Sequence, residues 1–543
     1  MEIHQGLTLT KKIRMVLPRH EQGGSFAAGG YARSTGEVGV CLATSGPGAT
    51  NMVTGIIDAK MDSIPLVAIT GQVPSTVLGS DAFQETDIIG ATFPLVKHSY
   101  MIQSVEEIPQ IINEAFHIAR TGRPGPVLVD IPKDIQQQEG IVDFNVSFDC
   151  PSYRPNLKPS ALQCKKAAHA IRTAKRPVIY AGGGIISSRA SKELRAFVKK
   201  TGIPVTTTLM GLGAFPSNDP LSLRMLGMHG AVYANIAINH ADLVIAMGVR
   251  FDDRVTGKLA EFCKDAEFIH IDIDPSEINK NILVDIPIQG DVKETLKILQ
   301  GYVEPKKDIK PWIRQLQDWK KEFPLSFKLK KGEIVPQSVV SNINKLANKD
   351  AIFSVGVGQH QMWAAQFLDF DEPQNWMCSS GLGAMGYGLS AAMGAQVAFP
   401  KRQVINIEGD GSFLMNIQEL QTLKVENIPV KNIILNNAHL GMVAQWEDRF
   451  YKSMRGHTFI GDANFAEIAH AFGVKSESIN DPKDVIPALK RMLKHNGPYV
   501  LDVKYPYNDK SHGHVMPMIP GNHAYLDTCL DESTTVRDYW RED

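Results

Sequence analysis

The sequence predicts an α/β protein made of three doubly wound domains, each built on a parallel sheet. Short apolar runs typical of buried strands alternate along the chain with segments of helical spacing. Residues 138–158 and 304–335 interrupt this alternation with proline or lysine and weak periodicity, so we expect linkers there. At roughly 150 residues per domain, 543 residues suffice for about three. We therefore expect domains at 1–143, 159–303 and 336–510, followed by a tail or lid at 511–543.

The first segment contains a small-residue helix and several apolar strands. We expect strands at residues 15–17, 39–43, 64–70 and 126–131. The second strand ends in the turn SGPG, and a helix follows that turn. Glu21 opens the small-residue helix directly after the first strand, where a carboxylate is favoured by the helix dipole alone.

The second segment begins with a helix at 161–173 and continues as alternating strands and helices. Its strands are expected at 177–180, 204–208, 243–247 and 267–273. A run of three glycines, Gly182 to Gly184, follows the first of them. Such a run permits close approach of a dinucleotide, but it lacks the GxGxxG fingerprint, so a nicotinamide dehydrogenase is disfavoured.

The third segment carries the most informative stretch, residues 406–446. A strand at 403–407 ends in Gly409-Asp410-Gly411, and a strand at 431–435 ends in Asn436-Asn437. Between them, Ile417, Leu420 and Leu423 have helical spacing, so the stretch predicts a parallel βαβ unit. Asp410 and Asn437 would then lie at neighbouring strand ends, where Mg²⁺ and a diphosphate could bind. GDG alone would usually be an ordinary strand-end turn with an Asx cap. GDG followed by the asparagine pair at the end of the next strand favours the metal site, and this combination resembles a thiamine diphosphate motif.

Composition and charge exclude several classes of partner. The formal net charge is −1 and the basic residues are scattered, so neither nucleic acid nor an anionic membrane is expected. No apolar run is long enough to span a bilayer. The six cysteines lie far apart with no CxxC pair, which fits free thiols in a reducing compartment. We expect a cytoplasmic protein, with the plastid stroma as the alternative if a transit peptide precedes this sequence.

Many motifs together resemble one enzyme family across nearly the whole chain. They include RHEQG, TSGPGATN, DAFQETD, RFDDRVTGK, GLGAMG, EGDGSF and LNNAHLGMVAQWEDRF, in this order. This set resembles the catalytic subunit of acetohydroxyacid (acetolactate) synthase. RFDDRVTGK is similar to the biosynthetic, FAD-containing enzymes and not to the FAD-free catabolic ones. The resemblance implies the thiamine diphosphate fold, with pyrimidine, central FAD-type and diphosphate domains.

The resemblance also implies roles for individual residues. Glu21 would protonate the aminopyrimidine ring of thiamine diphosphate, and Gln84, Lys133, Arg254 and Trp446 would act near the reaction centre. Mg²⁺ would be held by Asp410, Asn437 and the main-chain carbonyl of His439. Met385 would be the wedge under the bent cofactor. Without the family context, Met385 and Trp446 would be core residues and Arg254 a surface ion-pair partner of Asp252 or Asp253.

Two larger sets would bind the cofactors. The resemblance implies that thiamine diphosphate contacts Val357, Gly358, Gln359, His360, Gly383, Gly411, Ser412, Leu440, Gly441 and Met442. It implies that FAD contacts Arg123, Gly183, Gly184, Thr208, Leu209, Met228, His229, Gly248, Arg250, Asp252, Val255, Asp272, Ile273 and Asp291.

The implied reaction decarboxylates pyruvate on thiamine diphosphate and joins the hydroxyethyl carbanion to pyruvate or 2-ketobutyrate. The products, 2-acetolactate and 2-aceto-2-hydroxybutyrate, lead to valine, leucine and isoleucine. FAD would be structural, because no net redox step occurs. The resemblance further implies a homodimer or homotetramer, in which Glu21 of one chain meets the Asp410 site of another, and a small regulatory subunit.

The sequence departs from the family pattern at its start. The family has a helix, a strand and a YPGGA-type turn before RHEQG, whereas only 18 residues precede Arg19 here. We therefore expect an incomplete first domain. Lesser departures are Gly24, Gly29 and Ala438. Another thiamine diphosphate enzyme, such as pyruvate oxidase or glyoxylate carboligase, and an inactive scaffold remain alternatives; Glu21 disfavours glyoxylate carboligase, which lacks that carboxylate.

Overall fold

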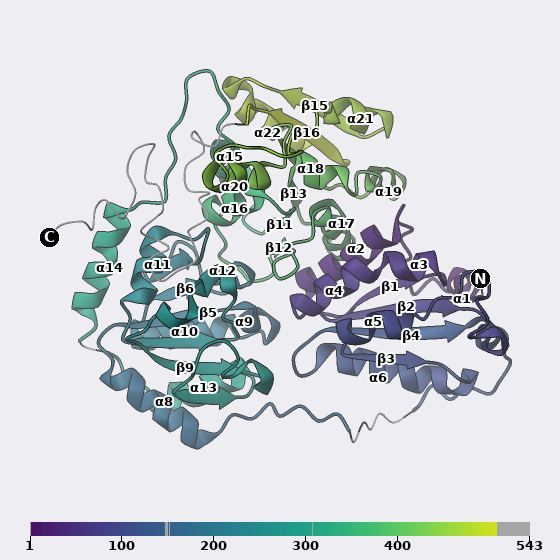
Figure 1. Cartoon of the computed structure of the whole chain (residues 1–543), viewed down its shortest axis with the longest axis horizontal. Coiled ribbons are helices and arrows are strands. Elements are labelled where there is room, and N and C mark those ends of the chain that lie inside the picture. The colour runs from purple at the N-terminus through teal and green to yellow at the C-terminus, as the bar shows by residue number, and fades with distance from the viewer. Residues whose placement is uncertain (1, 147–149, 151, 307, 508–543) are drawn as a thin grey trace.

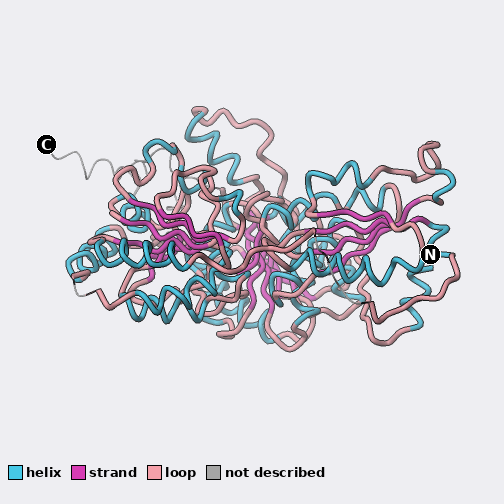
Figure 2. Tube along the Cα trace, turned by 90° about the horizontal axis from the view of Figure 1, so that it is seen from below, coloured by secondary structure: helices cyan, strands magenta, loops and turns pink. Residues whose placement is uncertain are grey.

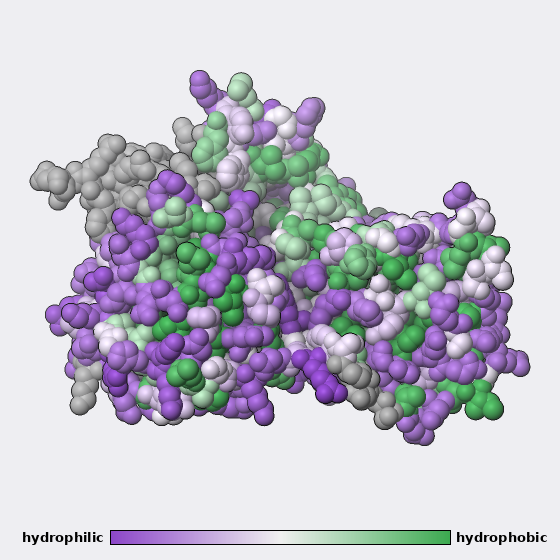
Figure 3. Space-filling view, turned by 60° about the horizontal axis from the view of Figure 1, so that its bottom comes forward, coloured by the Kyte–Doolittle hydropathy of each residue, from purple (hydrophilic) through white to green (hydrophobic). Residues whose placement is uncertain are grey.

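The computed structural model describes residues 2–146, 150, 152–306 and 308–507. Three parallel sheets form three α/β domains, with the N-terminal domain on the right of Figure 1, the central domain at lower left and the C-terminal domain above them. In Figure 2 helices lie on both sides of the sheets, so the strands are buried on both faces. Hydrophilic residues cover most of the face in Figure 3, with scattered apolar patches. The predicted fold class is confirmed.

The N-terminal domain has a four-stranded sheet in the order β1-β2-β4-β3. Its elements are α1 (Glu2–Leu9), α2 (Glu21–Thr35), β1 (Gly39–Ala43), α3 (Pro47–Asn51), α4 (Val53–Met61), β2 (Leu66–Gln72), α5 (Ile88–Thr92), β3 (His98–Met101), α6 (Ile108–Arg120), β4 (Pro126–Pro132) and α7 (Lys133–Gln137). The strand expected at 15–17 is wrong: these residues pair with no strand, and Met15 and Leu17 are exposed. Alternation without a neighbouring strand does not make a strand.

The central domain has a six-stranded sheet in the order β10-β9-β8-β5-β6-β7. Its elements are α8 (Ala161–Thr173), β5 (Pro177–Ala181), α9 (Gly183–Ser187), α10 (Ser191–Thr201), β6 (Val205–Thr207), β7 (Ser222–Met225), α11 (Val232–Asn239), β8 (Leu243–Met247), α12 (Asp253–Thr256), β9 (Glu267–Asp272), β10 (Ile286–Gln289) and α13 (Val292–Tyr302). The predicted bounds of α8 and β8 are confirmed. The short edge strands β7 and β10 were not predicted.

The segment expected as a second linker contains a regular helix, α14 (Lys310–Glu322). Trp312, Leu316 and Trp319 are buried on one face of this helix and belong to the core of the central domain. Their spacing is helical, and the surrounding lysines concealed it in the sequence. The expectation of a linker is therefore wrong for these residues, because the apolar face of the helix packs against the core of the central domain.

The C-terminal domain has a six-stranded sheet in the order β12-β11-β13-β14-β16-β15. Its elements are α15 (Pro336–Leu346), β11 (Ile352–Val355), α16 (Gln359–Phe367), β12 (Trp376–Cys378), α17 (Tyr387–Ala398), β13 (Val404–Gly409), α18 (Asp410–Leu414), α19 (Glu419–Val425), β14 (Lys431–Asn436), α20 (Gly441–Phe450), α21 (Phe465–Ala471), β15 (Lys475–Ile479), α22 (Val485–Lys494) and β16 (Tyr499–Lys504). The predicted βαβ unit is confirmed. The tail or lid expected at 511–543 lies outside the described residues.

Helices α2 and α17 join the N-terminal and C-terminal domains. They pack closely because glycines face each other's backbone: a Cβ on Gly30 would lie 2.2 Å from the carbonyl oxygen of Ala391, and one on Gly394 would lie 1.8 Å from that of Ala27. Phe26 also packs edge-on against Tyr387, with ring centroids 5.4 Å apart. Gly30 of α2 and Gly394 of α17 therefore permit the close packing between these two domains.

Candidate functional site

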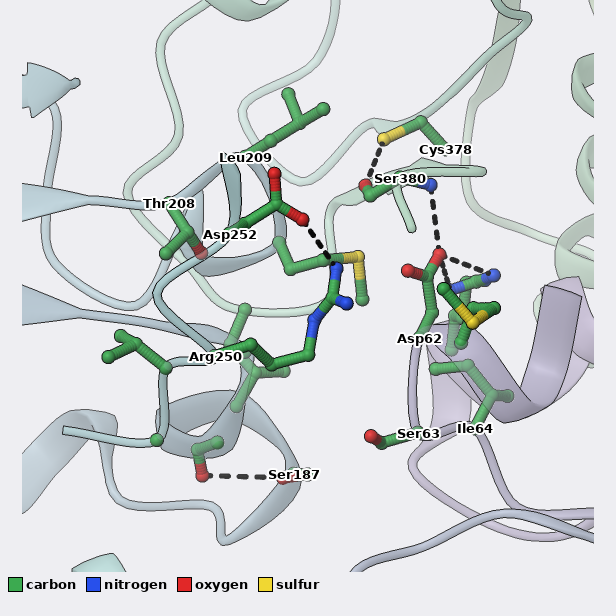
Figure 4. Close-up of a pocket in the computed structure, with 18 of the residues that line it drawn as sticks. Asp62, Ser63, Ile64, Ser187, Thr208, Leu209, Arg250, Asp252, Cys378 and Ser380 are labelled. Carbon is green, nitrogen blue, oxygen red and sulfur yellow. Dashed lines mark hydrogen bonds and ion pairs between the residues drawn. The ribbon is translucent and has the colours of Figure 1, made fainter. Parts of the chain in front are cut away.

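A cavity of about 1000 Å³ lies where the three domains meet. The N-terminal domain contributes Asp62, Ser63 and Ile64 to its wall, which lie opposite Arg250 and Asp252 of the central domain in Figure 4. The C-terminal domain contributes Met385 and Trp446, among others. The cavity is large enough for a cofactor-sized ligand.

Every residue that the family resemblance implied for FAD lines this cavity. Many of them follow the carboxyl ends of the central strands. Gly183 and Gly184 follow β5, Gly248 follows β8 and Thr208 follows β6. A Cβ on Gly184 would lie 2.6 Å from the Cα of Gly248, so the two glycines allow their loops to meet at the cavity wall.

The charged groups in this part of the cavity are mostly paired or neutralised. Arg250 donates to Asp252 at 2.9 Å. Burial raises the pKa of Asp272 to about 7 and lowers the pKa of His229 to about 4. Arg123 reaches from the N-terminal domain to Glu277 at 2.6 Å and Asp274 at 3.1 Å. A polar ligand with several acceptors and donors suits this lining.

The two strand ends of the βαβ unit lie side by side, as predicted. Gly409 is opposite Leu435 in the parallel pair β13–β14, so Asp410 and Asn437 emerge at the same edge. The Oδ1 atom of Asp410 accepts from the amide of Gly411 at 2.9 Å, whereas its Oδ2 atom is buried with no hydrogen-bond partner among the described residues. Burial raises the pKa of this carboxyl to about 6. A buried carboxylate oxygen without a partner fits a cation ligand.

Asn437 lies beside this carboxylate, and its Oδ1 atom accepts from the amide of His439 at 3.1 Å. Within the described residues, no group of three or more His, Cys, Asp or Glu side chains could hold a metal. A site here would therefore draw on one carboxylate, one amide and a main-chain carbonyl, which suits Mg²⁺ better than a transition metal.

The residues implied for thiamine diphosphate gather around the same sheet edge. Val357, Gly358, Gly383, Met385 and Met442 line the cavity. The remaining residues implied for thiamine diphosphate do not line the cavity; these are Gln359, His360, Gly411, Ser412, Leu440 and Gly441. Two glycines lie close to neighbouring side chains here: a Cβ on Gly411 would lie 2.6 Å from Leu440 Cδ2, and one on Gly441 would lie 2.2 Å from Gln359 Oε1.

A buried pair lies beneath this edge. His360 Nε2 is 3.7 Å from Glu408 Oε2, and neither atom has a hydrogen-bond partner in the described structure. Burial lowers the pKa of His360 to about 3 and raises the pKa of Glu408 to about 7. Near neutral pH the imidazole is therefore uncharged, whereas the carboxyl is present in both its protonated and its ionised form.

Glu21, Gln84 and Lys133 lie away from the cavity lining. Glu21 Oε2 accepts from Asn51 Nδ2 at 3.0 Å, on the TSGPGATN turn. Gln84 packs against the same turn: a Cβ on Gly46 would lie 2.8 Å from the main-chain carbonyl oxygen of Gln84. Lys133 begins α7 directly after β4 and is exposed. Within one chain, these candidates are thus gathered on the N-terminal domain and separate from the cavity.

Arg254 and Trp446 both line the cavity. Arg254 also pairs with Asp253 at 3.5 Å and is 63% exposed, so the ordinary surface ion pair is present too. Trp446 is half-buried and stands 4.9 Å from the ring of Phe450. It is not a core residue, and its ring is available to a ligand.

Two acidic residues near the site were missed from the sequence. Asp62 is buried on the cavity wall. Glu419 is fully buried and accepts the main-chain amides of Arg19 at 3.0 Å and His20 at 3.1 Å, next to Glu21. Both carboxylates contact main chain of another domain, and no local pattern in the sequence marks such contacts.

None of the helices in the described part of the chain has the length and hydrophobicity to cross a bilayer.

Comparison with known proteins agrees with this geometry. Three family models match: the N-terminal TPP binding domain of thiamine pyrophosphate enzymes at residues 1–91, their central domain at 164–299 and their C-terminal TPP binding domain at 356–503. Among curated relatives, acetolactate synthase 3, chloroplastic, of Brassica napus is 52% identical over 98% of this chain and 83% of its own length. Acetolactate synthase, chloroplastic, of Arabidopsis thaliana is 52% identical over 99% of this chain and 82% of its own.

Proposed function

This chain belongs to the acetolactate synthases, a family of thiamine diphosphate enzymes, and we propose that it joins pyruvate to a second 2-ketoacid after decarboxylation. The second ketoacid is pyruvate or 2-ketobutyrate, and the products are 2-acetolactate or 2-aceto-2-hydroxybutyrate. The observation that carries this proposal is the cavity that is lined both by Met385, Met442 and Trp446 and by the glycine loops of the central domain.

Thiamine diphosphate and Mg²⁺ would be held at the ends of β13 and β14. Mg²⁺ would be bound by the Oδ2 atom of Asp410, which has no hydrogen-bond partner among the described residues, and by the amide oxygen of Asn437 and the carbonyl of His439. Gly411 and Gly441 let the chain approach a diphosphate closely. When bound, thiamine diphosphate would supply a carbon nucleophile for the ketoacid carbonyl and would stabilise the electron pair that remains on the substrate carbon when CO₂ leaves.

The protein's own groups would orient the substrates and hold a proton. Arg254 would pair with a ketoacid carboxylate at the cavity mouth, in place of its exposed contact with Asp253. Trp446 would fill the acceptor pocket and thereby favour the longer ketoacid. Glu21 would share a proton with the cofactor ring nitrogen.

FAD would occupy the central-domain part of the cavity. Its support is the set of glycine loops, the Arg250–Asp252 pair and the buried Asp272, all on the cavity wall. The reaction has no net redox step, so FAD would have a structural role.

We further propose a homodimer or homotetramer in which Glu21 serves the Asp410 site of a second copy. Glu21 does not line the cavity of its own chain. Large apolar side chains are exposed near both halves of the site: Phe83, beside Gln84, is 90% exposed, and Phe459, whose ring centroid lies 5.4 Å from that of His439, is 65% exposed. Such exposure suits a subunit interface. A small regulatory subunit is proposed from the family alone.

The names of the two acetolactate synthases compared with this chain place those enzymes in chloroplasts. For this chain we therefore favour the plastid stroma over the cytoplasm as the compartment.

The purified protein should form acetolactate from pyruvate with thiamine diphosphate, Mg²⁺ and FAD under nitrogen. No electron acceptor should be needed, which separates this activity from pyruvate oxidase. Formation of acetate only when an acceptor is added would contradict the proposal. Absence of both product and tryptophan quenching by thiamine diphosphate would favour a non-catalytic scaffold.

Trp446→Leu should lower the preference for 2-ketobutyrate over pyruvate. Leucine removes the indole ring that would contact the extra methylene of 2-ketobutyrate, and a contact with one methylene is worth about 10-fold or more in selectivity. The measurement is the product ratio with both ketoacids present at equal concentration. Phe450→Leu is the matched control, since Phe450 contacts Trp446 but does not line the cavity. An unchanged ratio for Trp446→Leu would remove it from the acceptor pocket.

A further inference from the structure

The turn formed by Asp62 and Ser63, after α4, lies where the three domains meet (Figure 4). The side chain of Asp62 is 1% exposed, and Arg33 donates to its Oδ2 atom at 3.1 and 3.2 Å. Arg33 also donates to Asp58 at 2.6 Å and lies over the ring of Tyr387. Two carboxylates and one guanidinium thus form a buried cluster of the N-terminal domain.

This cluster reaches the C-terminal domain. Asp62 Oδ2 accepts the main-chain amide of Ser380 at 2.9 Å, and its Oδ1 accepts that of Gly381 at 2.7 Å. These residues are more than 300 positions away in the sequence. The loop they begin, residues 380–384, leads directly to Met385 on the cavity wall. Asp62 therefore holds the start of the loop that presents Met385.

Neighbouring groups strengthen the same connection. Asp58 is hydrogen-bonded to the side chain of Ser379, whose Oγ atom accepts the amide of Ala384 at 2.8 Å. On the other side, Ser63 accepts from Arg123 Nε at 2.8 Å, and Arg123 pairs with Glu277 of the central domain. One turn of the N-terminal domain thus touches both other domains at the cavity.

Stability alone is a weak reason for such a cluster. A buried ion pair gains little over well-packed apolar residues of the same volume, because both ions lose their hydration. What a charged carboxylate does, and an apolar residue cannot, is hold two main-chain amides in a fixed direction. Its position at the root of a cavity loop points to a role in geometry.

We propose that Asp62 is a positioning residue for the reaction, which fixes the loop of residues 380–384 and thereby sets the position of Met385 in the cavity. This inference rests on the proposed acetolactate synthase function. Asp62 acts through the loop and touches no reacting atom.

Asp62→Asn tests the contact from the N-terminal domain. Asparagine has one acceptor oxygen, so one of the two loop amides would face an NH₂ group. Gly381→Ala tests the contact from the loop, because its Cβ would lie 3.0 Å from Asp62 Oδ1 while all charges are kept. Asp369→Asn is the matched control: Asp369 pairs with Arg224 between the central and C-terminal domains but contacts neither the cavity nor the loop.

The first readout is amide hydrogen exchange of the peptide 379–386 in the protein without cofactors. We expect exchange there to accelerate by about tenfold or more in Asp62→Asn and to remain unchanged in Asp369→Asn. The second readout is steady-state kinetics of the fully loaded enzyme. We expect kcat to fall by about tenfold in Asp62→Asn and Gly381→Ala, with KM for pyruvate changed by less than about threefold, since a small displacement of a positioning group affects the transition state most.

A double-mutant cycle with Met385→Ala decides whether Asp62 acts through this loop. We expect Asp62→Asn to lower kcat little further once Met385 is alanine. Additive losses, or equal kcat losses in Asp62→Asn and Asp369→Asn, would overturn the inference. If the wild-type protein forms no acetolactate, the proposed function fails instead, and the hydrogen-exchange comparison still tests the contact.

Discussion

Glu21→Gln should abolish acetolactate formation while FAD still binds. Glutamine keeps the size of the side chain and its contact with Asn51, but it cannot share a proton with the cofactor ring. General acid–base groups contribute about 10²- to 10⁴-fold, so we expect a loss in kcat of this order. FAD binding should be unchanged, because Glu21 does not line the cavity. Acetolactate formation measures the first effect and the flavin absorbance of the purified protein the second.

Glu37→Gln is the matched control, because it makes the same chemical change elsewhere in the N-terminal domain. Glu37 forms an exposed ion pair with Arg189. Gln22→Glu would be less suitable, since it adds a charge beside Glu21. Turnover by Glu21→Gln within about tenfold of Glu37→Gln would refute the role of Glu21.

Asp410→Ala should prevent Mg²⁺-dependent binding of thiamine diphosphate. Asp410 is the only carboxylate among the proposed ligands, and its Oδ2 atom has no hydrogen-bond partner among the described residues. Loss of a supporting residue around a metal costs about 10- to 100-fold in affinity, so loss of a ligand should raise the Kd for Mg²⁺ by at least about 100-fold. Tryptophan quenching on addition of Mg²⁺ and thiamine diphosphate measures this, since Trp446 lines the cavity.

The matched control for this variant is Asp462→Ala, which removes an exposed carboxylate paired with Lys504 in the same domain. It should quench like the wild type. Quenching by Asp410→Ala at wild-type Mg²⁺ concentrations would exclude Asp410 as a ligand.

The two variants together test whether the site is shared between chains. If Glu21 of one chain serves Asp410 of its partner, a hybrid dimer of Glu21→Gln and Asp410→Ala chains has one intact site. Random exchange of subunits should then restore about a quarter of wild-type activity. If each chain held a complete site, mixing would restore none.

Local patterns predicted the parts of the fold that depend on neighbours in the sequence. The bounds of α8 and β8 are as expected, because helical spacing and a continuous apolar run need no distant information. The βαβ unit around Asp410 and Asn437 is right for the same reason: consecutive strands of such a unit bring their carboxyl ends to one edge. The strand at 15–17 was wrong because only a pairing partner could have made it one.

The residues proposed for FAD depend on the tertiary structure in a different way. Composition and spacing indicated only glycine loops after strands, and the individual residues came from resemblance to a family. Their meeting on one cavity wall depends on the order β9-β8-β5-β6, which no single segment encodes.

The fold class, the family and the strand ends that carry Asp410 and Asn437 can all be predicted from the sequence alone. These follow from periodicity, turn residues and motifs that extend over a few dozen residues. Only the tertiary structure decided that Asp62 holds the amides of Ser380 and Gly381, and that Glu419 holds those of Arg19 and His20. The reason is physical: a buried carboxylate is stable only with donors to satisfy it, and those donors come from main chain hundreds of residues away.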